Sequence, residues 1–412
     1  MKKSYGSNAI VGQSGGPTAA INASLAGVIS AALESKYIGK LYGMANGIDG
    51  MLHERLYDLT ELFTGKPGDV SLLKHTPGAA LGSCRFKLPS PDSDPDFYEN
   101  LFSLFEKYEI GYFFYIGGND SMDTTAKVSA YAAKKGIDIK VVGVPKTVDN
   151  DLCGTDHTPG FGSAAKFVAT VFAELRRDTA VYTQKCVTVV EVMGRDAGWL
   201  TASAVLARTA RSEGPDLIYL PELPFSYESC FKNIEKAWEN HPDVLIAISE
   251  GVRLADGTYL GADSTKTDKF GHVALSGAAK VLEERIKEHF GCKVRSVELN
   301  TPQRCGAHVA SLTDITESFG VGNFAVKCAE QGESGVMAGI MRVSDEPYGS
   351  GYASFDVSVI ANKVKAVPRE YVNAEGNGIT EAGIRYLRPL IKGECKIDYI
   401  DGVPCHYIFE KI

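Results

Sequence analysis

Two polar clusters, each directly after a short apolar run, carry the side chains in this sequence best suited to chemistry. They are residues 117–121 (GGNDS) and residues 145–151 (PKTVDND). Phosphoryl transfer needs a positioned base, a metal on the phosphates and nearby cations. Asp149 and Asp151 supply the carboxylates for the base and for Mg²⁺, and Lys146 supplies a cation for a donor phosphate. The same residue types are common in solvated turns, so this spacing alone leaves a plain turn open.

A glycine-rich turn near the N-terminus is a second candidate for phosphate binding. Gly15 and Gly16 lie in GQSGGP, between an expected strand at 8–12 and an expected small-residue helix at 18–33. Such turns let backbone N–H groups approach a phosphate at a helix N-terminus. Many of them are only tight turns, so the motif is weak evidence by itself.

Several charged residues lie in or just after other strand-like runs. Arg195, Arg295 and Arg304 have this position, which fits the capture of a sugar phosphate by a planar guanidinium. Each of them taken singly also fits a surface arginine. Glu250 ends the apolar run VLIAIS, where it is either a site carboxylate or a helix cap.

The elements that must position these residues follow from the apolar runs. Residues 112–116 and 139–144 have the length and composition of buried strands, and residues 121–136 between them form a helical pattern that stops at a glycine. In such a parallel unit, the loops at the carboxyl ends of the strands bind ligands. Further strands are expected at 38–44, 186–192, 217–220, 244–249, 293–299 and 335–343, and further helices at 97–108, 163–177, 197–211, 227–240, 273–290 and 317–331. We interpret 253–272 as a polar surface insertion and expect two α/β domains that face each other across a cleft.

Composition excludes several other classes of protein. The chain has 412 residues, a formal net charge of -8 and nine cysteines without a CxxC pair. The acidic balance argues against a nucleic-acid surface, and the cysteine pattern argues against a disulfide framework or structural zinc. The N-terminus lacks the apolar core of a signal peptide and no uncharged apolar run is long enough for a membrane span. We expect a cytoplasmic protein with no nucleic-acid or membrane partner.

The order and spacing of five motifs resemble the phosphofructokinase family. The motifs are GGNDS, PKTVDND, VEVMGR (190–195), ISEG (248–251) and PQR (302–304), within a resemblance that covers about residues 8–345. The pattern is most similar to the pyrophosphate-dependent branch. The resemblance implies two Rossmann-like three-layer domains and Mg²⁺-dependent, reversible phosphoryl transfer from pyrophosphate to the 1-hydroxyl of fructose 6-phosphate. It implies a donor domain from 1–160 plus about 300–345, a sugar domain from 161–299 and a C-terminal extension, 346–412, that packs on both.

The resemblance also implies a role for individual residues. Asp149 is the base, and Lys146 and Arg195 complete the catalytic set. The residues implied for the donor are Gly15, Gly16, Arg85, Gly118, Asp120, Ser121 and Lys146. The residues implied for the sugar phosphate are Thr147, Asp149, Asp151, Lys185, Met193, Gly194, Arg195, Glu250, Arg295 and Arg304. The residues implied for the metal are Asn119, Asp120 and Asp151.

In the family, the cations that correspond to Lys185 and Arg295 come from a neighbouring subunit. The resemblance therefore implies a homodimer or homotetramer with a sugar-phosphate site shared between subunits.

The choice of donor depends on a few positions. ATP-dependent relatives typically have glycine where this chain has Asp120, because the α-phosphate needs the room, and an aromatic residue where it has Ala45. Asp120 fills that space and repels a third phosphate, whereas pyrophosphate avoids the clash. Asn119 replaces the usual metal-binding aspartate, and Thr301 replaces a His or Tyr near the sugar phosphate. An ATP-dependent phosphofructokinase and a non-catalytic regulatory subunit of the same fold remain the alternatives.

Overall fold

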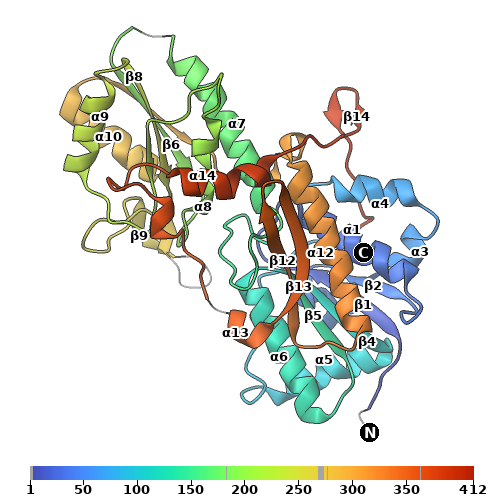
Figure 1. The fold of residues 1–412 in the computed structure, drawn as a ribbon. Helices are drawn as coiled ribbons and strands as arrows, with labels where there is room; N and C mark the ends of the chain where they lie inside the picture. The colour runs from blue at the N-terminus through green and yellow to red at the C-terminus, as the bar shows by residue number, and fades with distance from the viewer. Residues whose placement is uncertain (1–2, 182, 268–272, 276, 362) are drawn as a thin grey trace.

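The computed structural model describes residues 3–181, 183–267, 273–275, 277–361 and 363–412. Within these residues, the strands form one seven-stranded sheet, one four-stranded sheet and two small two-stranded pairs. The two larger sheets belong to separate α/β units, one at each end of the molecule (Figure 1). None of the helices in these ranges is long and apolar enough to cross a membrane.

The seven-stranded sheet has a parallel centre and antiparallel edges. Its order is β13-β12-β5-β4-β1-β2-β3, and only β2–β3 and β12–β13 pair antiparallel. The strands are β1 (Asn8–Gln13), β2 (Leu41–Met44), β3 (Leu56–Asp58), β4 (Ile110–Gly117), β5 (Lys140–Pro145), β12 (Val336–Asp345) and β13 (Tyr348–Asp356). Because β1, β4 and β5 run parallel side by side, their carboxyl ends meet at one edge of the sheet.

Helices cover both faces of this sheet. They are α1 (Ile21–Glu34), α5 (Pro95–Lys107), α6 (Asn119–Lys135) and α12 (Leu312–Glu330). Alternate side chains of β4 point to opposite faces, so Phe114 and Ile116 join the core with α1 and α12. Phe113 and Tyr115 join the core with α5 and α6. This alternation is the period of two that a strand imposes, and both faces of β4 are therefore buried.

The four-stranded sheet is entirely parallel, in the order β11-β6-β8-β7. Its strands are β6 (Cys186–Val192), β7 (Leu217–Tyr219), β8 (Asp243–Ser249) and β11 (Lys293–Glu298). On one face lie α7 (Phe161–Thr179), α8 (Trp199–Ala202) and the 3₁₀ helix η1 (Ser203–Ala207), and on the other lie α9 (Tyr227–Ala237) and α10 (Ala278–Phe290). Each of the two α/β units is thus a sheet covered by helices on both faces, which is the three-layer architecture expected from the sequence.

The C-terminal segment contacts both α/β units. Tyr386 packs on Trp199 beside the smaller sheet, with ring centroids 5.2 Å apart. Further along, Phe409 joins the core of the larger sheet and lies 4.9 Å from the ring of Tyr57. The remaining short elements are α2 (Ile48–Leu52), α3 (Leu59–Phe63), α4 (Pro67–Lys74), β9 (Ala262–Thr267), β10 (Val273–Leu275), α11 (Pro302–Cys305), η2 (Ala307–Val309), α13 (Val357–Ile360), η3 (Arg369–Tyr371), α14 (Glu381–Leu387), η4 (Arg388–Ile391), β14 (Tyr399–Ile400) and β15 (Val403–Pro404).

Two predicted helices are wrong in part. The run 197–211 forms only the single turn α8 and the 3₁₀ helix η1, and the chain becomes extended at Arg208. The run 273–290 begins as β10, which pairs with β9, and α10 starts only after Gly277, whose φ is +87°. Glycine takes this left-handed conformation without a steric cost, so it separates the strand from the helix.

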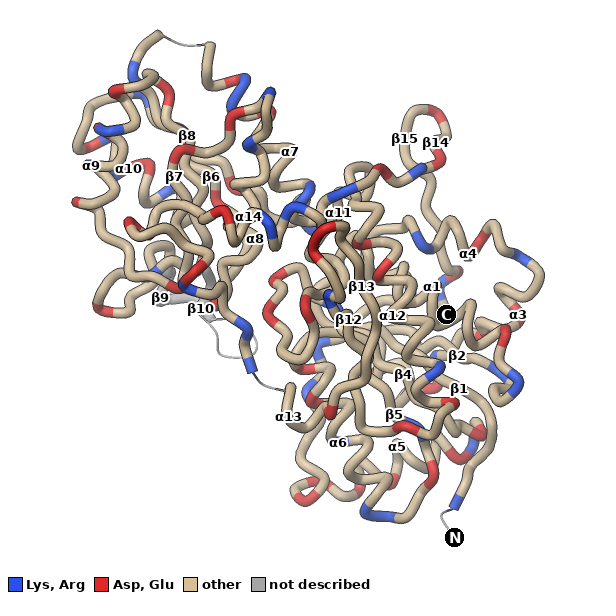
Figure 2. Tube along the Cα trace, viewed as in Figure 1, with Lys and Arg blue, Asp and Glu red and all other residues tan. Residues whose placement is uncertain are grey.

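The expected insertion at 253–272 also differs from the prediction in part. It contains β9, while residues 268–272 lie outside the described residues. Figure 2 shows Lys and Arg interspersed with Asp and Glu along the traces of both α/β units, in keeping with a net charge of -8.

Candidate active site

The loop after β5 brings a buried cation and two carboxylates together. Burial, the Asp151 charge and the Glu250 charge raise the pKa of Asp149 to about 7, although Lys146 opposes the shift. Burial also raises the pKa of Asp151. The hydroxyl of Thr147 donates to Asp149 Oδ2 at 3.4 Å and accepts from the Asp149 N–H at 3.1 Å. A carboxyl group with a pKa near neutrality suits a general base.

Lys146 is the first residue of this loop and is 3% exposed. Its Nζ donates to the carbonyl oxygen of Gly16 at 2.6 Å. Burial lowers the pKa of Lys146 to about 8, and the Asp149 and Asp151 charges oppose that shift. The loop after β5 is therefore in direct contact with the glycine-rich turn after β1, across the end of β4, which lies between these two strands.

The loop after β4 adds the GGNDS residues beside this lysine. Gly117 has no space for a side chain, since an added Cβ would lie 1.8 Å from Ser121 Oγ. Ser121 Oγ in turn lies 2.5 Å from Ser14 Oγ in the glycine-rich turn. Gly118 caps α6 without a side-chain hydrogen bond, and Asp120 is exposed in the first turn of that helix. A helix N-terminus with such a cap can bind a phosphate, because its N–H groups donate hydrogen bonds to the phosphate oxygens.

The segment that precedes Arg85 approaches the same turn. The Gly15 N–H donates to the Cys84 carbonyl at 3.2 Å, and Ser83 Oγ donates to the Gly15 carbonyl at 2.7 Å. Arg85 follows directly, is exposed, and its charge contributes to the lowered pKa of Lys146. Arg85 therefore lies in the same electrostatic neighbourhood as Lys146.

The sugar-binding candidates lie at the carboxyl ends of β6 and β8. The Gly194 N–H donates to Glu250 Oε1 at 3.2 Å, and Ser249 Oγ donates to the Gly194 carbonyl. Gly194 has φ +139°, and a Cβ there would lie 2.6 Å from the Ala197 carbonyl oxygen. Burial raises the pKa of Glu250, which the Arg195 charge opposes. Because the Glu250 charge also raises the pKa of Asp149, the loops of the two sheets face the same site.

A pocket opens at this end of β6. It is lined by Glu191, Val192, Met193, Glu250, Glu298, Asn300 and Gln303. Gln303, which is 1% exposed, was not among the predicted site residues. Its Oε1 accepts from the Met193 N–H at 3.1 Å, so it fixes the backbone of a predicted sugar contact. Its place inside the PQR motif was the signal that could have identified it.

Arg304 lies where the two α/β units meet. A Cβ on Gly16 would lie 3.4 Å from Arg304 Nη1, and the Arg304 charge contributes to the lowered pKa of Lys146. Its Nε is buried without a hydrogen-bond partner among the described residues. Thr301, three residues earlier, is exposed at the start of α11. Arg304 is thus a cation with an unused donor at the site.

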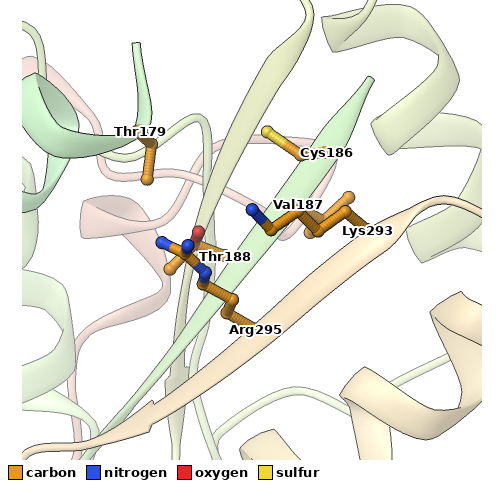
Figure 3. A pocket seen from close by; sticks show the side chains of 6 residues that line it. All are labelled: Thr179, Cys186, Val187, Thr188, Lys293 and Arg295. Carbon is orange, nitrogen blue, oxygen red and sulfur yellow. The ribbon is translucent and has the colours of Figure 1, made fainter. Parts of the chain in front are cut away.

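Lys185 and Arg295 are not brought to this site by their own chain. Lys185 directly precedes β6, and Arg295 pairs with Thr188 in the first half of that strand, whereas Met193 follows its last residue. At about 3.3 Å per residue, roughly 17–26 Å of chain separates them from Met193. Figure 3 shows Arg295 in a separate pocket on the exposed edge strand β11, with Thr179, Cys186, Val187, Thr188 and Lys293.

The oxygen ligands beside Asp151 fit a magnesium ion. No group of three or more His, Cys, Asp and Glu side chains that could hold a metal occurs in the described ranges. Mg²⁺, however, commonly uses one or two carboxylates together with substrate phosphates and water. Asn119 Nδ2 donates to Asp151 Oδ2 at 3.2 Å, and Asn119 Oδ1 is buried without a hydrogen-bond partner among the described residues. An unsatisfied buried oxygen is costly, and a bound cation would satisfy it.

The fold and the site together define a phosphoryl-transfer enzyme built from two three-layer α/β units. A carboxyl group with a pKa near neutrality, a buried lysine and a helix N-terminus lie together with a second carboxylate, Glu250, and with the charges of Arg195 and Arg304. This is the set of groups that positions and neutralises a transferring phosphoryl group.

Comparison with known proteins gives the family. Residues 8–329 match the family model for phosphofructokinase, and the chain belongs to that family. It is 42% identical over 400 residues to the pyrophosphate–fructose 6-phosphate 1-phosphotransferase of Halomonas elongata, covering 96% of this chain and 94% of the relative. It is 42% identical over 402 residues to the enzyme of the same name from Methylococcus capsulatus, with the same coverage.

A solved structure agrees with these relatives. The crystal structure of the pyrophosphate-dependent phosphofructokinase from Nitrosospira multiformis is similar to this chain with a TM-score of 0.89 and 38% sequence identity. The similarity covers 98% of this chain and 97% of the other. The fold class expected from the sequence is therefore confirmed.

Proposed function

We propose that this chain catalyses the reversible transfer of a phosphoryl group from pyrophosphate to the 1-hydroxyl of fructose 6-phosphate. The products are fructose 1,6-bisphosphate and phosphate. The observation that carries this proposal is the position of Asp149, a half-buried carboxyl group with a pKa of about 7 on which the charges of Lys146 and Glu250 both act. Relatives with that activity, 42% identical over nearly the whole chain, support the choice of substrates.

Asp149 performs the proton transfer. Its carboxylate accepts the proton of the 1-hydroxyl as that oxygen attacks the terminal phosphorus of pyrophosphate. The new bond joins this oxygen to phosphorus, the bridging P–O bond breaks, and phosphate leaves with the bond electrons. In reverse, protonated Asp149 returns the proton to the sugar oxygen. A base with a pKa near the working pH serves both directions.

The other residues bind and orient the two substrates. Lys146, Arg85, the Gly15–Gly16 turn and the start of α6 at Gly118 and Ser121 hold pyrophosphate. On the sugar side, Thr147 lies beside the base, and Met193, Gly194, Arg195 and Glu250 hold the fructose. Asp151 binds from the same loop as the base, on the side of the donor. Arg304, whose Nε has no partner among the described residues, binds the 6-phosphate.

Asn119, Asp120 and Asp151 would hold Mg²⁺. The ion neutralises charge on the pyrophosphate oxygens when it is bound. The buried, unpartnered Oδ1 of Asn119 beside Asp151 supports this assignment.

The donor is selected by charge and space. Asp120 lies at the start of α6, where its carboxylate would repel the α-phosphate of a nucleotide. Ala45 is 5% exposed and offers no aromatic surface to an adenine ring. Pyrophosphate has no third phosphate and needs no stacking surface, so it fits both positions.

Each of the two α/β units binds one of the two substrates. We assign 1–160 with about 300–345 to pyrophosphate, 161–299 to fructose 6-phosphate, and 346–412 to an extension that packs on both. Lys185 and Arg295, at the far end of the smaller sheet, would serve the sugar phosphate of a neighbouring subunit in a homodimer or homotetramer. A cytoplasmic enzyme is consistent with nine free cysteines.

Phosphorus NMR tests the reaction directly. Purified protein is incubated with fructose 6-phosphate, pyrophosphate and Mg²⁺, and separately with fructose 1,6-bisphosphate and phosphate. We expect equal amounts of sugar bisphosphate and phosphate in the first mixture, and pyrophosphate in the second. No phosphoryl transfer in either mixture, from protein that is folded, would refute the proposed function.

A further inference from the structure

Asn150, the residue between the two site carboxylates, is held completely by its surroundings. It is fully buried, and its φ of +53° places it in the left-handed region. Its Oδ1 accepts from the Thr158 N–H at 3.1 Å and from Lys365 Nζ at 3.3 Å. Its Nδ2 donates to the hydroxyl of Tyr386 at 3.3 Å. Two of these three partners come from the C-terminal segment.

Lys365 directs its charge to the backbone of the same loop. Nζ donates to the carbonyl oxygens of Asp156 at 2.7 Å and of Thr155 at 3.3 Å. The Lys365 N–H donates to the Asp151 carbonyl at 2.8 Å. Burial lowers the pKa of Lys365 to about 8, against the attraction of the Asp156 and Asp151 charges. The cost of burying this ammonium is offset by acceptors that all belong to loop 150–156.

Tyr386 closes the same arrangement from a second direction. Its hydroxyl donates to the Asp156 carbonyl at 2.6 Å while it accepts from Asn150. Its ring contacts Trp199 and Tyr371, and the guanidinium of Arg342 is 4.5 Å from the ring centroid. A tyrosine packed against three neighbours has little freedom to move, so its hydroxyl is a fixed anchor for the loop.

The same residues connect this loop with the sugar side of the site. Trp199 Nε1 donates to the Lys365 carbonyl at 2.7 Å, and Trp199 follows Arg195 by four residues. Two residues after Lys365, the Val367 N–H donates at 2.9 Å to Glu222, which also accepts from the Gly198 N–H at 2.8 Å. The C-terminal segment therefore bridges the base loop and the chain that follows the sugar contacts.

We propose that Lys365 and Tyr386 are positioning residues for phosphoryl transfer, which hold Asn150 so that Asp149 faces the sugar and Asp151 faces the donor. This inference rests on the proposed function. Asp149 lies close enough to Glu250 to share its field, while Asp151 accepts from Asn119, so the two carboxylates already serve different sides. Loss of either anchor removes one of the three hydrogen bonds that hold the Asn150 side chain, and disturbs the geometry of attack more than it disturbs the binding of either substrate.

The test compares kcat with KM in the full-length enzyme. Lys365→Met removes the ammonium, Tyr386→Phe removes one oxygen, and Lys363→Met is the control because Lys363 is exposed two residues earlier. We expect kcat to fall by about 10- to 100-fold in the first two variants, since a small misplacement of a reacting group has effects of that size. KM for fructose 6-phosphate and for pyrophosphate should change less than about threefold, the range of ordinary surface changes.

Circular dichroism and thermal unfolding show whether each variant is folded. A folded Tyr386→Phe or Lys365→Met enzyme with wild-type kcat, or with a change confined to KM, would overturn the proposal. If Lys365→Met does not fold, Tyr386→Phe alone decides, because it keeps the shape of the ring. Wild-type protein inactive with pyrophosphate would refute the proposed function instead, and the same kcat comparison with ATP would then test the two anchors.

Discussion

Asn119 and Asp151 share a hydrogen bond of 3.2 Å across the ends of two adjacent strands. The amide uses its nitrogen in this bond, and its oxygen stays buried without a partner among the described residues. The neutral Asn119 side chain therefore donates a hydrogen bond to Asp151. A carboxylate at position 119 could not donate such a bond and would repel Asp151 unless a cation lay between them. In the Mg²⁺ site that we propose, most of the negative charge around the ion would therefore come from the donor phosphates and from Asp151.

Replacing Asn119 by aspartate should change metal binding and stability in opposite directions. Without Mg²⁺, Asn119→Asp places two carboxylates side by side and should lower the melting temperature. With Mg²⁺, the extra charge should tighten binding of the ion, by about tenfold if the effect is like that of other groups around a metal. Calorimetric titration with Mg²⁺ measures the affinity. An unchanged affinity would show that position 119 does not lie at the metal.

Removing the base should affect turnover far more than binding. Asp149→Ala should lower kcat by roughly 10²- to 10⁴-fold, the range for a lost general base. Titration calorimetry with fructose 6-phosphate measures whether the sugar still binds. If the variant turns over at nearly the wild-type rate, Asp149 is not the base.

Asp120 should control the choice between the two donors. At about 4 Å, two unit charges repel by about 1 kcal/mol in water and about 4 kcal/mol at an effective dielectric near 20. Asp120→Gly should therefore shift the ratio of kcat/KM for ATP to that for pyrophosphate by roughly 5- to 1,000-fold. Because Asp120 is exposed, we expect the lower part of that range. Asp123→Gly, on the same helix, is the control, and equal ratios in both variants would show that the charge of Asp120 does not select the donor.

A shared site predicts complementation between two damaged subunits. Asp149→Ala lacks the base, and Arg295→Ala lacks a cation that we assign to the neighbour's site. A hybrid oligomer contains one site with an intact base and an intact neighbouring arginine. Mixing the two variants after partial dissociation should restore activity, to roughly a quarter of wild type for random pairing of dimers. No gain over the separate variants, while subunits exchange, would place Arg295 outside the shared site.

His157 should make the stability of the fold depend on pH. It is 1% exposed, and its ring lies 2.8 Å from Asp156 and 2.7 Å from Glu317. Burial lowers its pKa, but the two hydrogen bonds outweigh burial and raise it overall, while the pKa values of Asp156 and Glu317 are lowered. The contribution of the imidazolium is complete below its unfolded pKa of about 6.5 and is lost as pH rises through the higher folded value. The carboxylates' contribution is present above about pH 4.3 and is lost on acidification.

His157→Gln should therefore cost the most stability between about pH 4.5 and pH 6.5. Breaking such a buried pair costs about 3–5 kcal/mol, and the difference from wild type should shrink at higher pH. Urea unfolding across this range measures it. His53→Gln is the control, since His53 is exposed beside Asp49. A difference that is constant with pH would mean that His157 is neutral in the folded protein.

The parts of the fold with strong local signals could be predicted from the sequence. The strand at 186–192 coincides with β6, because a run of apolar residues without Gly or Pro has few alternatives in a buried parallel sheet. The helix after GGNDS ends at Gly136 in the left-handed conformation, as its position predicted. The reactive loops lie at the carboxyl ends of β4 and β5 for the same topological reason.

The prediction failed where the local pattern was ambiguous. Residues 197–207 of the run 197–211 are all buried, so this part has no polar face that would distinguish a long helix from α8 followed by η1. At 273–290, Gly277 was a visible break, but the apolar residues before it were included in the helix. β13 was not predicted, because its pairing with β12 is a tertiary contact at the edge of the sheet.

The anchors of the base loop could not be predicted at all. Lys365 and Tyr386 lie more than two hundred residues from Asn150, in a segment without a recognisable motif. Periodicity reports which face of an element is buried, and it does not report which distant side chain fills the space beside it. The contacts of Asn150 are therefore information that only the folded chain contains.

The central claim is that this enzyme uses pyrophosphate, and a comparison of donors tests it most directly. Initial rates with fructose 6-phosphate and Mg²⁺ are measured over a range of pyrophosphate concentrations and over the same range of ATP. The account predicts a kcat/KM for pyrophosphate at least about fivefold above that for ATP, since repulsion by the exposed Asp120 contributes about 1 kcal/mol. A higher kcat/KM for ATP would contradict it.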